Sequence, residues 1–285
     1  MRVLVVGGTG TVGSAVVAAL HASGHESLVM SRSAEKAERR PAGAAHIVAD
    51  LEQPATLPAA FSGVDGVFLL LPVSQTETAQ GLAGVEAAQA AGVRRIVYMS
   101  VVMPPGSDVV PHIASKVPVE RAVQASGIPW TILRPNNFFQ NDLWLRDAIT
   151  TYGVYPQPLG PRGVSRVDVR DIAEAAASAF TRGVGGIVPL NGPRGLTGDD
   201  TARVYSEILK RPVRYAGDDL DVWEKQASAM FPPWMAHDFR IMYDYFIRHG
   251  AHASGTDFAA QQHLLGRAPR PFEAFVEELA EAWKK

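Results

Sequence analysis

The chain begins Met1-Arg2-Val3-Leu4-Val5-Val6-Gly7-Gly8-Thr9-Gly10-Thr11-Val12-Gly13, and this stretch decides the fold class. Residues 3–6 form a short, apolar, mostly β-branched run, which is typical of a parallel strand covered on both faces. The glycines that follow predict a tight turn, and residues 14–22 predict a helix. Such glycines let the backbone approach a diphosphate and let the helix pack against the strand. Exposed N–H groups at the helix start would hold the phosphates.

The glycine spacing fits two registers. Gly8, Gly10 and Gly13 make GxGxxG, whereas Gly7, Gly10 and Gly13 make GxxGxxG. Either register indicates a dinucleotide, and the alternative is a flexible loop. A strand before the glycines and a helix after them are the context that the motif requires. We therefore predict a nucleotide site at this turn.

Composition narrows the functional class. The chain has 285 residues, 47% of them hydrophobic, and a formal net charge of −2, which is typical of a globular protein of one large or two modest domains. Lys and Arg are scattered without a basic run, so we expect no nucleic-acid partner. The absence of cysteine excludes disulfides, thiolate catalysis and cysteine-bound metals. No apolar run reaches the roughly 18 residues of a membrane span, and residues 1–6 are too short for a signal-peptide core. We expect a cytoplasmic protein without a membrane partner.

The rest of the chain alternates between strand and helix patterns. The expected strands are residues 27–30, 45–49, 66–71, 95–100, 129–134 and 186–190. The expected helices are residues 54–62, 75–91, 171–181, 197–209, 221–250 with a break at Pro232-Pro233, and 272–283. This alternation predicts an α/β protein with a Rossmann-type, doubly wound parallel sheet and ligands at the carboxyl ends of its strands. We expect an NADP(H)-binding domain over residues 1–155, to which residues 164–192 return, and a smaller, mostly helical substrate lobe over residues 193–285.

The end of the second strand indicates which dinucleotide is bound. In NAD-preferring folds an acidic residue about 20 residues after the glycines binds the ribose 2′-hydroxyl. Here Ser31 and Arg32 occupy that position and Lys36 follows, so a 2′-phosphate would meet positive charge. NADP(H) is therefore favoured over NAD(H), although these cations could also belong to a solvated helix start. Asp50 and Leu51 end the third strand, where they would meet the adenine edge; Asp50 could instead be a helix cap.

Several motifs resemble the NmrA-like, atypical short-chain dehydrogenase/reductases, a group with quinone and triphenylmethane-dye reductases and redox-sensing regulators. The glycine turn and Arg32 match that family. So does the long stretch Ser126-Gly127-Ile128-Pro129-Trp130-Thr131-Ile132-Leu133-Arg134-Pro135-Asn136-Asn137-Phe138-Phe139-Gln140-Asn141, which is more specific than the glycines. Val169-Arg170-Asp171-Ile172-Ala173 and Leu264-Leu265-Gly266-Arg267-Ala268-Pro269 also look familial. The similarity covers nearly the whole chain.

The resemblance implies a set of cofactor contacts. Gly7, Thr9, Gly10, Thr11 and Val12 would surround the diphosphate, and Gly13 completes the cofactor-binding glycine motif. Leu70, Leu71 and Pro72 would flank the adenine-side ribose and the nicotinamide, and Pro135, Asn137 and Phe138 would lie near the nicotinamide. Lys116 matches the lysine that binds the nicotinamide ribose. If this is its role, replacing Lys116 by alanine should impair cofactor use and leave thermal unfolding nearly unchanged.

The chain departs from the wider superfamily at His112, where the superfamily carries its proton-donating tyrosine. On one continuous helix, His112 and Lys116 share a face and could both act at the cofactor. The neighbouring ammonium and a helix N-terminus would favour neutral imidazole, which is a weak acid. Such a donor suits an acceptor whose reduced form is a stabilised anion, such as a quinone, an enone or a conjugated cation.

Pro118 leaves two geometries open. If the helix begins at Pro111, it should kink near Pro118 with His112 and Lys116 on one face. If Ser115 is the N-cap, Pro118 falls in the first turn and His112 belongs to a loop. Ser100, at the end of the fifth strand, is a weaker candidate for the site.

The aromatics of the second half, Trp223, Phe231, Trp234, Tyr243, Tyr245 and Phe246, are expected to be mostly core, with some lining an apolar pocket for a flat ring. His249 and His252 lack a third ligand, so no metal is expected. We predict an NADPH-dependent oxidoreductase that passes hydride to a conjugated or aromatic small molecule and is a monomer or homodimer. The alternative is a non-catalytic NADP(H)-binding redox sensor, which the missing tyrosine would favour.

Overall fold

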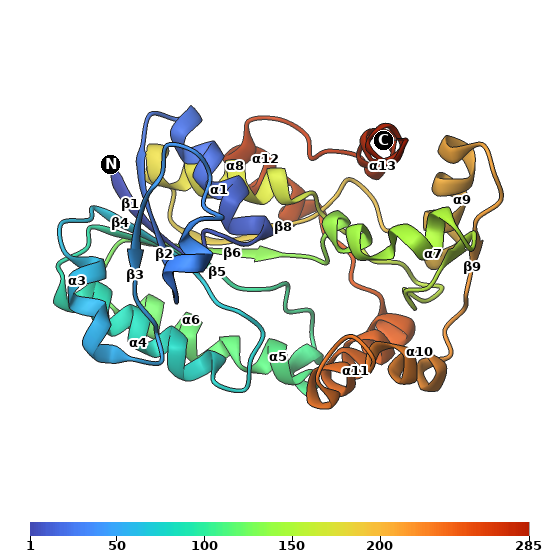
Figure 1. Ribbon diagram of the computed structural model, residues 1–285, viewed down its shortest axis with the longest axis horizontal. Coiled ribbons are helices and arrows are strands. Elements are labelled where there is room, and N and C mark those ends of the chain that lie inside the picture. The colour runs from blue at the N-terminus through green and yellow to red at the C-terminus, as the bar shows by residue number, and fades with distance from the viewer. Residues whose placement is uncertain (285) are drawn as a thin grey trace.

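The structure, a computed structural model, describes residues 1–284 and is built on a seven-stranded sheet in which all strands run parallel (Figure 1). The strand order is β3-β2-β1-β4-β5-β6-β8. The strands are β1 Arg2–Val6, β2 Glu26–Ser31, β3 Ala45–Val48, β4 Gly66–Leu70, β5 Arg95–Met99, β6 Trp130–Pro135 and β8 Gly186–Leu190. The prediction of a doubly wound, Rossmann-type parallel sheet is confirmed, and each predicted strand is present to within about two residues.

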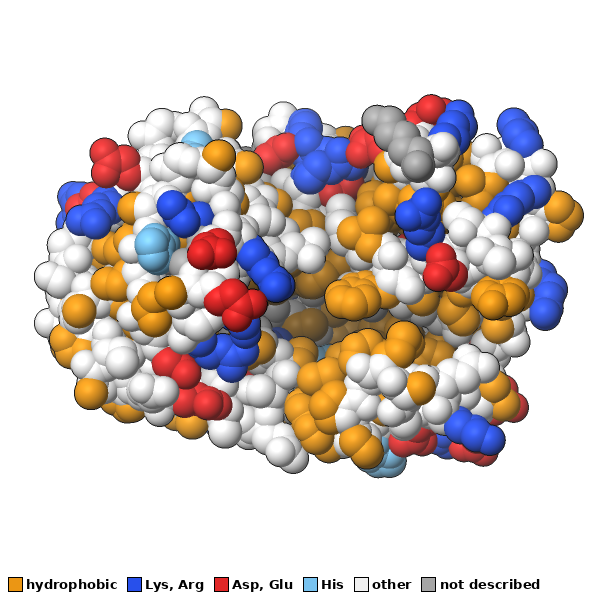
Figure 2. All heavy atoms as spheres, viewed as in Figure 1, with side chains coloured by type: hydrophobic (Ala, Val, Ile, Leu, Met, Phe, Trp, Pro, Cys, Tyr) orange, Lys and Arg blue, Asp and Glu red, His pale blue; other side chains and the backbone are white. Residues whose placement is uncertain are grey.

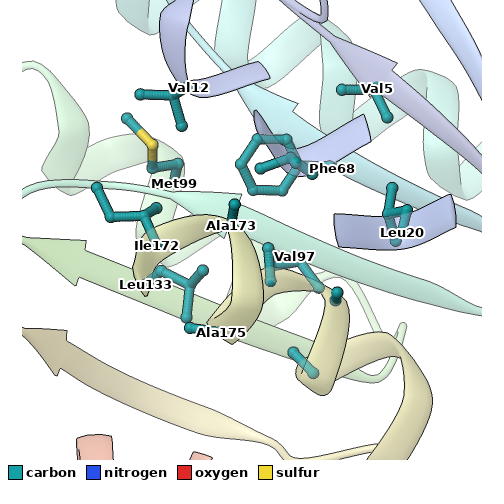
Figure 3. Close-up of a cluster of buried hydrophobic side chains, with 14 of the residues drawn as sticks. Val5, Val12, Leu20, Phe68, Val97, Met99, Leu133, Ile172, Ala173 and Ala175 are labelled. Atoms are coloured by element: carbon teal, nitrogen blue, oxygen red, sulfur yellow. The ribbon is translucent and has the colours of Figure 1, made fainter. Parts of the chain in front are cut away.

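Both faces of the sheet are covered because its strands are apolar on both sides. Val3 and Val5 face one layer, made of α1 (Thr11–Ala22), α8 (Val169–Arg182) and α12 (Gly255–Leu265). Figure 3 shows side chains of α1 and α8 meeting the sheet there. Leu4 and Val6 face the other layer, made of α3 (Leu57–Phe61), α4 (Glu77–Ala90) and α6 (Lys116–Ala125). The alternation follows from the two-residue period of a strand.

The order of the strands reverses beside β1. β1 pairs with β2 on one side and β4 on the other, so the connections after β1 and β4 leave toward opposite faces of the sheet. Ligands of open α/β sheets bind at the carboxyl ends of the strands beside such a switch point. The glycine turn after Val6 and the segment after Leu70 lie at this point.

A second group of elements lies beyond the carboxyl ends of the strands (Figure 1). It contains β7 (Val154–Tyr155), paired in parallel with β9 (Arg214–Tyr215), and it packs around a separate hydrophobic cluster that includes Ile149, Tyr205 and Phe246. Its helices are η3 Phe139–Leu145, α7 Arg146–Thr150, α9 Gly198–Leu209, α10 Leu220–Ala227, α11 Pro233–His249 and α13 Phe272–Trp283. The division at residue 193 stays a prediction.

Two helices differ from expectation. α1 begins at Thr11 rather than at residue 14, because Gly10 is the N-cap and leaves the next turn helical. α12 was not predicted: its apolar residues form no clear stripe, although Ser254 and Asp257 make a capping box at its start. α12 returns to the sheet, where Leu264 packs into the first cluster. The short helices are α2 Ala34–Ala37, η1 Pro54–Thr56, η2 Ser107–Val109 and α5 Pro111–Ala114.

No helix of residues 1–284 combines the length and apolar character that crossing a membrane requires.

Candidate active site

One cavity of about 770 Å³ runs from the carboxyl ends of the strands to α10 and α11. Figure 2 shows the hollow, with hydrophobic side chains gathered along both of its edges. Every predicted site residue except Gly13 lines it. These residues are Gly7, Thr9, Gly10, Thr11, Val12, Ser31, Arg32, Lys36, Asp50, Leu51, Leu70, Leu71, Pro72, His112, Lys116, Pro135, Asn137 and Phe138.

The glycine turn has the shape that a diphosphate needs. Gly7 adopts φ +72°, a left-handed conformation that glycine tolerates, and its carbonyl accepts the Gly10 N–H at 3.1 Å. A Cβ on Gly13 would stand 2.2 Å from the Gly7 carbonyl oxygen, and one on Gly8 would stand 2.9 Å from Cγ1 of Val29. Gly13 does not line the cavity. A side chain at this position would push α1 away from β1, so this glycine serves the packing of helix on strand.

The first turn of α1 is left open to an anion. Its N-cap, Gly10, offers no side chain to the helix, and the turn contains no acidic residue. The free N–H groups and the positive end of the helix dipole therefore remain available to a phosphate. These features fit a dinucleotide diphosphate.

Two cations stand at the end of β2. Arg32 and Lys36 line the cavity and are exposed, and neither has an ion-pair partner within residues 1–284. By contrast, Arg39 lies 3.8 Å from Glu35 on the surface. Asp50 also lines the cavity, and its carboxylate accepts the Glu52 N–H at 3.0 Å, so it stabilises a turn as well as facing the ligand space.

Lys116 is buried and paired. Its Nζ donates to Oε1 of Glu77, whose side chain is fully buried at the start of α4. The other carboxylate oxygen, Oε2, accepts Oγ of Ser115 at 3.2 Å. Lys116 therefore lines the cavity while its positive charge is paired with the carboxylate of Glu77.

His112 and Lys116 both line the cavity, but the chain between them matches neither expected geometry in full. Ser115, with φ −60° and ψ −24°, is the N-cap of α6, so Pro118 falls in the first turn of α6 as the second geometry expected. Ser115 accepts no capping bond; its Oγ instead donates to the His112 carbonyl at 3.0 Å. His112 lies in the short helix α5 rather than in a loop, because Pro111 starts a helical turn, so that part of the second geometry is wrong.

The surroundings of His112 were not foreseen. Its Nδ1 lies 2.6 Å from Oδ1 of Asp238 on α11, and both side chains are buried. The sequence argument for a neutral ring considered the Lys116 ammonium, which Glu77 balances, and a helix N-terminus, but no carboxylate. Asp238 is therefore a partner of the ring that the sequence argument left out.

A buried cation holds the segment after β6. Arg166 is fully buried and donates through Nε to Oδ1 of Asn137 at 3.2 Å and through Nη2 to the Phe138 carbonyl at 2.9 Å. Its charge is balanced by Asp142, at 2.6 Å, and Asp142 also accepts Tyr205 Oη at 3.0 Å. Asn137 is thereby fixed with its amide nitrogen left for a ligand. The sequence reasoning did not single out Arg166 or Asp142.

Ser100 is another buried polar group at the cavity. It is 2% exposed, and its Oγ has no hydrogen-bond partner within the described chain. A buried hydroxyl without a partner is uncommon, and a bound ligand would satisfy it.

The far half of the cavity is mostly apolar and has no charged side chain among its described residues. Of the six aromatics considered from the sequence, Trp223, Phe231, Tyr243, Tyr245 and Phe246 line it, more than expected, and Trp234 does not. Within the described lining, the only Asp, Glu, Lys or Arg residues are Arg32, Lys36, Asp50 and Lys116, which all belong to the sheet half. No group of three or more His, Asp or Glu residues in the described chain is placed to hold a metal ion.

The chain matches a known protein family and is similar to two curated reductases. The NmrA-like family model matches residues 1–276. The chain is 37% identical over 241 residues to an NAD(P)H azoreductase of Xenophilus azovorans, covering 81% of this chain and 82% of the relative. It is 32% identical over 284 residues, covering 99% of both chains, to a (4-alkanoyl-5-oxo-2,5-dihydrofuran-3-yl)methyl phosphate reductase of Streptomyces griseus.

Among solved structures, the Citrobacter sp. triphenylmethane reductase complexed with NADP(H) superposes with a TM-score of 0.82 at 25% identity, covering 98% of this chain and 100% of that one. These comparisons confirm the predicted class, an NAD(P)-binding reductase. The chain belongs to the NmrA-like family.

Proposed function

We propose that the chain is an NADPH-dependent reductase whose acceptor is an uncharged, conjugated ring compound such as a quinone or an aromatic azo compound. The observation that carries this proposal is the contrast within one cavity. Its charged lining lies in the sheet half, and the far half is formed mostly by aromatic and aliphatic side chains, with Gln157 and Gln226 as uncharged polar members.

The sheet half suits the phosphorylated dinucleotide. The open first turn of α1 would take the diphosphate, and Arg32 and Lys36 would take the 2′-phosphate. Lys116, Asn137 and Ser100 line the cavity and would hold the nicotinamide end. When bound, the reduced nicotinamide supplies a hydride.

The far half suits a flat, uncharged acceptor. Phe239 and Met242 of α11 line it, and Trp144 and Met230 line its mouth while 82% and 64% exposed. Exposed apolar side chains at a cavity mouth lose contact with water when a ring covers them. The Streptomyces relative acts on a phosphate ester. No cation of the described chain lines the far half here, so a phosphorylated acceptor would lose its hydration without gaining a partner.

The test is a pair of quinone acceptors, of which one carries an added sulfonate anion. We expect NADPH-dependent reduction of 1,4-naphthoquinone, and a kcat/KM for naphthoquinone sulfonate that is lower by about tenfold or more, since burying an unpaired sulfonate costs several kcal/mol. A second prediction tests whether the cavity lining, rather than the intrinsic reactivity of the two quinones, causes the difference in kcat/KM. Met230→Lys should narrow the difference in kcat/KM between the two acceptors. Lys225→Met, an exposed change on α10 just before the turn that carries Met230 and outside the cavity, should not. Equal or better use of the sulfonate would refute the acceptor class.

A further inference from the structure

The contact between His112 and Asp238 joins the two halves of the cavity. His112 lies on α5, and Asp238 lies on α11, 126 positions later in the chain. The Nδ1–Oδ1 distance is 2.6 Å, and the two side chains are 8% and 7% exposed. The next histidine–carboxylate pair of α11, His237 with Glu224, is at 3.0 Å but has a 63% exposed histidine. The His112 pair is therefore built into the protein, whereas the other is a surface contact.

The carboxylate of Asp238 has no hydrogen-bond partner other than His112 within residues 1–284. A buried carboxylate is costly unless it is paired, so its stable arrangement has the Nδ1–H of His112 donating to it. This bond fixes which ring nitrogen faces the cavity. Phe239, the neighbour of Asp238, packs its ring against the imidazole edge, with centroids 5.7 Å apart and planes at 86°. Carboxylate and phenyl ring together hold the imidazole in one orientation.

Nε2 is left for a ligand. His112 lines the cavity, and its Nε2 has no hydrogen bond to any described residue. The nearby ammonium of Lys116 is balanced by Glu77, so the carboxylate of Asp238 is the unbalanced charge beside the ring. With Nδ1–H donating to Asp238, a second proton on the ring is carried by Nε2, which then faces the cavity as a hydrogen-bond donor.

We propose that His112 and Asp238 form a proton-donating pair, in which Nε2 of His112 protonates the acceptor and Asp238 is a positioning residue. This proposal rests on the proposed function. For a neutral azo acceptor, one nitrogen gains a hydride from the reduced nicotinamide, which is oxidised. The other nitrogen gains the Nε2 proton, so N=N becomes HN–NH, and solvent returns a proton to the imidazole.

The same helix places both reactants. α11 supplies Asp238 to the ring of His112, and it supplies Phe239, Met242 and Tyr243 to the acceptor side of the cavity. A shift of α11 would therefore move the acceptor and the proton donor together. This arrangement takes the place of the tyrosine that the wider superfamily carries at this position.

The first test asks whether removing the Asp238 carboxylate slows only those reductions in which the acceptor must gain a proton. Reduction of neutral azobenzene needs hydride and a proton, whereas a triphenylmethane dye cation such as crystal violet needs only hydride. The charge of this dye is spread over three conjugated rings, so, unlike a sulfonate or a phosphate, it brings no localised charge into the apolar half of the cavity. We expect Asp238→Asn to lower kcat for azobenzene by about 100-fold or more, the size of a general-acid contribution. The loss for the dye cation should be at least tenfold smaller, and Asp238→Glu should recover part of the azobenzene rate.

The control is Asp244→Asn on the same helix, where Asp244 pairs with Arg248 at 3.0 Å on the surface. This variant should keep the wild-type ratio of azobenzene to dye rates. Equal losses for the two acceptors in Asp238→Asn would show a purely structural role, and the absence of any loss would show no role. Either result would overturn the proposal.

A second measurement does not depend on turnover. In ¹⁵N-histidine-labelled protein without cofactor, His112→Gln identifies the His112 signals. We expect an exchangeable Nδ1 proton at strongly downfield shift, which moves upfield in Asp238→Asn and is unchanged in Asp244→Asn. An unprotonated Nδ1 in the wild-type protein would refute the pair even if the protein reduces every acceptor. If no acceptor is reduced but the downfield proton is present, the proposed function fails and the pairing geometry stands.

Discussion

Glu77 and Lys116 form an ion pair inside the protein, with side chains 0% and 8% exposed. Glu77 begins α4 and Lys116 begins α6, so the pair joins two helices that cover the same face of the sheet. Lys116 also lines the cavity. Its position is therefore set by a carboxylate behind it, and any contact with a ribose uses an ammonium that is already oriented.

This pair changes the expected effect of losing either partner. We predict that Glu77→Gln lowers the free energy of unfolding by about 3–5 kcal/mol, because a buried ammonium is left without its counter-charge. Lys116→Ala should also destabilise the protein, contrary to the expectation from sequence. Urea unfolding measures both changes, and the double variant Glu77→Gln/Lys116→Met should recover part of the loss. Glu86→Gln, an exposed change on α4, is the control. Unfolding midpoints equal to the wild type would show that the pair contributes nothing.

Arg32 is predicted to select the phosphorylated cofactor. Arg32→Asp removes a charge-assisted contact and adds repulsion, so the Kd for NADPH should rise by at least about tenfold while that for NADH changes little. Arg39→Asp is a matched control, because Arg39 is an exposed cation of the same segment that does not line the cavity. Titration of nucleotide fluorescence gives both constants. A parallel rise for NADPH and NADH would mean that Arg32 does not read the phosphate.

The glycine turn gives a stability prediction. Gly13→Ala should lower the free energy of unfolding by about 2 kcal/mol or more, since its Cβ would stand 2.2 Å from the Gly7 carbonyl oxygen and α1 would have to move away from β1. Gly255→Ala, at the start of α12, meets no atom within 4 Å and should be neutral or slightly stabilising. Thermal unfolding compares the two. A Gly13→Ala protein as stable as Gly255→Ala would exclude close packing of helix on strand at this site.

Acid should weaken the contact between α8 and the segment after α12. Burial raises the pKa of Glu174, but hydrogen bonds from Arg270 and Arg267 outweigh it, so the pKa lies below its ordinary value. A carboxyl group with a lowered pKa stabilises the fold above the pKa of the unfolded chain, and this stabilisation is lost as pH falls through the folded pKa. We predict a falling melting temperature below about pH 4.5. Glu174→Gln should show a smaller fall over the same range, and an identical fall would exclude Glu174 as a contributor.

Local patterns predicted most of the fold. The apolar run of β1 and the glycines after it specified the strand, the turn and the helix, because each depends on neighbours in the chain. α12 was missed because its burial is decided by α8 and β8, which lie far away in sequence. The cytoplasmic location and the oligomeric state stay predictions.

The cavity lining could be predicted from the resemblance, but the partners behind it could not. Glu77, Asp238 and Arg166 lie 39, 126 and 29 positions from the site residues that they hold. No local pattern marks such residues, since each looks like an ordinary charged side chain of a helix or loop. Only the packing of the helices shows that they are buried and what they bind.

The central claim is hydride transfer from NADPH to an uncharged conjugated acceptor. Its most direct test is the initial rate of NADPH oxidation by the purified protein with 1,4-naphthoquinone, with NADH at the same concentration in parallel. The account predicts enzyme-dependent oxidation with kcat/KM at least about tenfold higher for NADPH than for NADH, the value of one charge-assisted contact. Tight NADPH binding without any oxidation in the presence of this acceptor would contradict it and would favour a redox sensor.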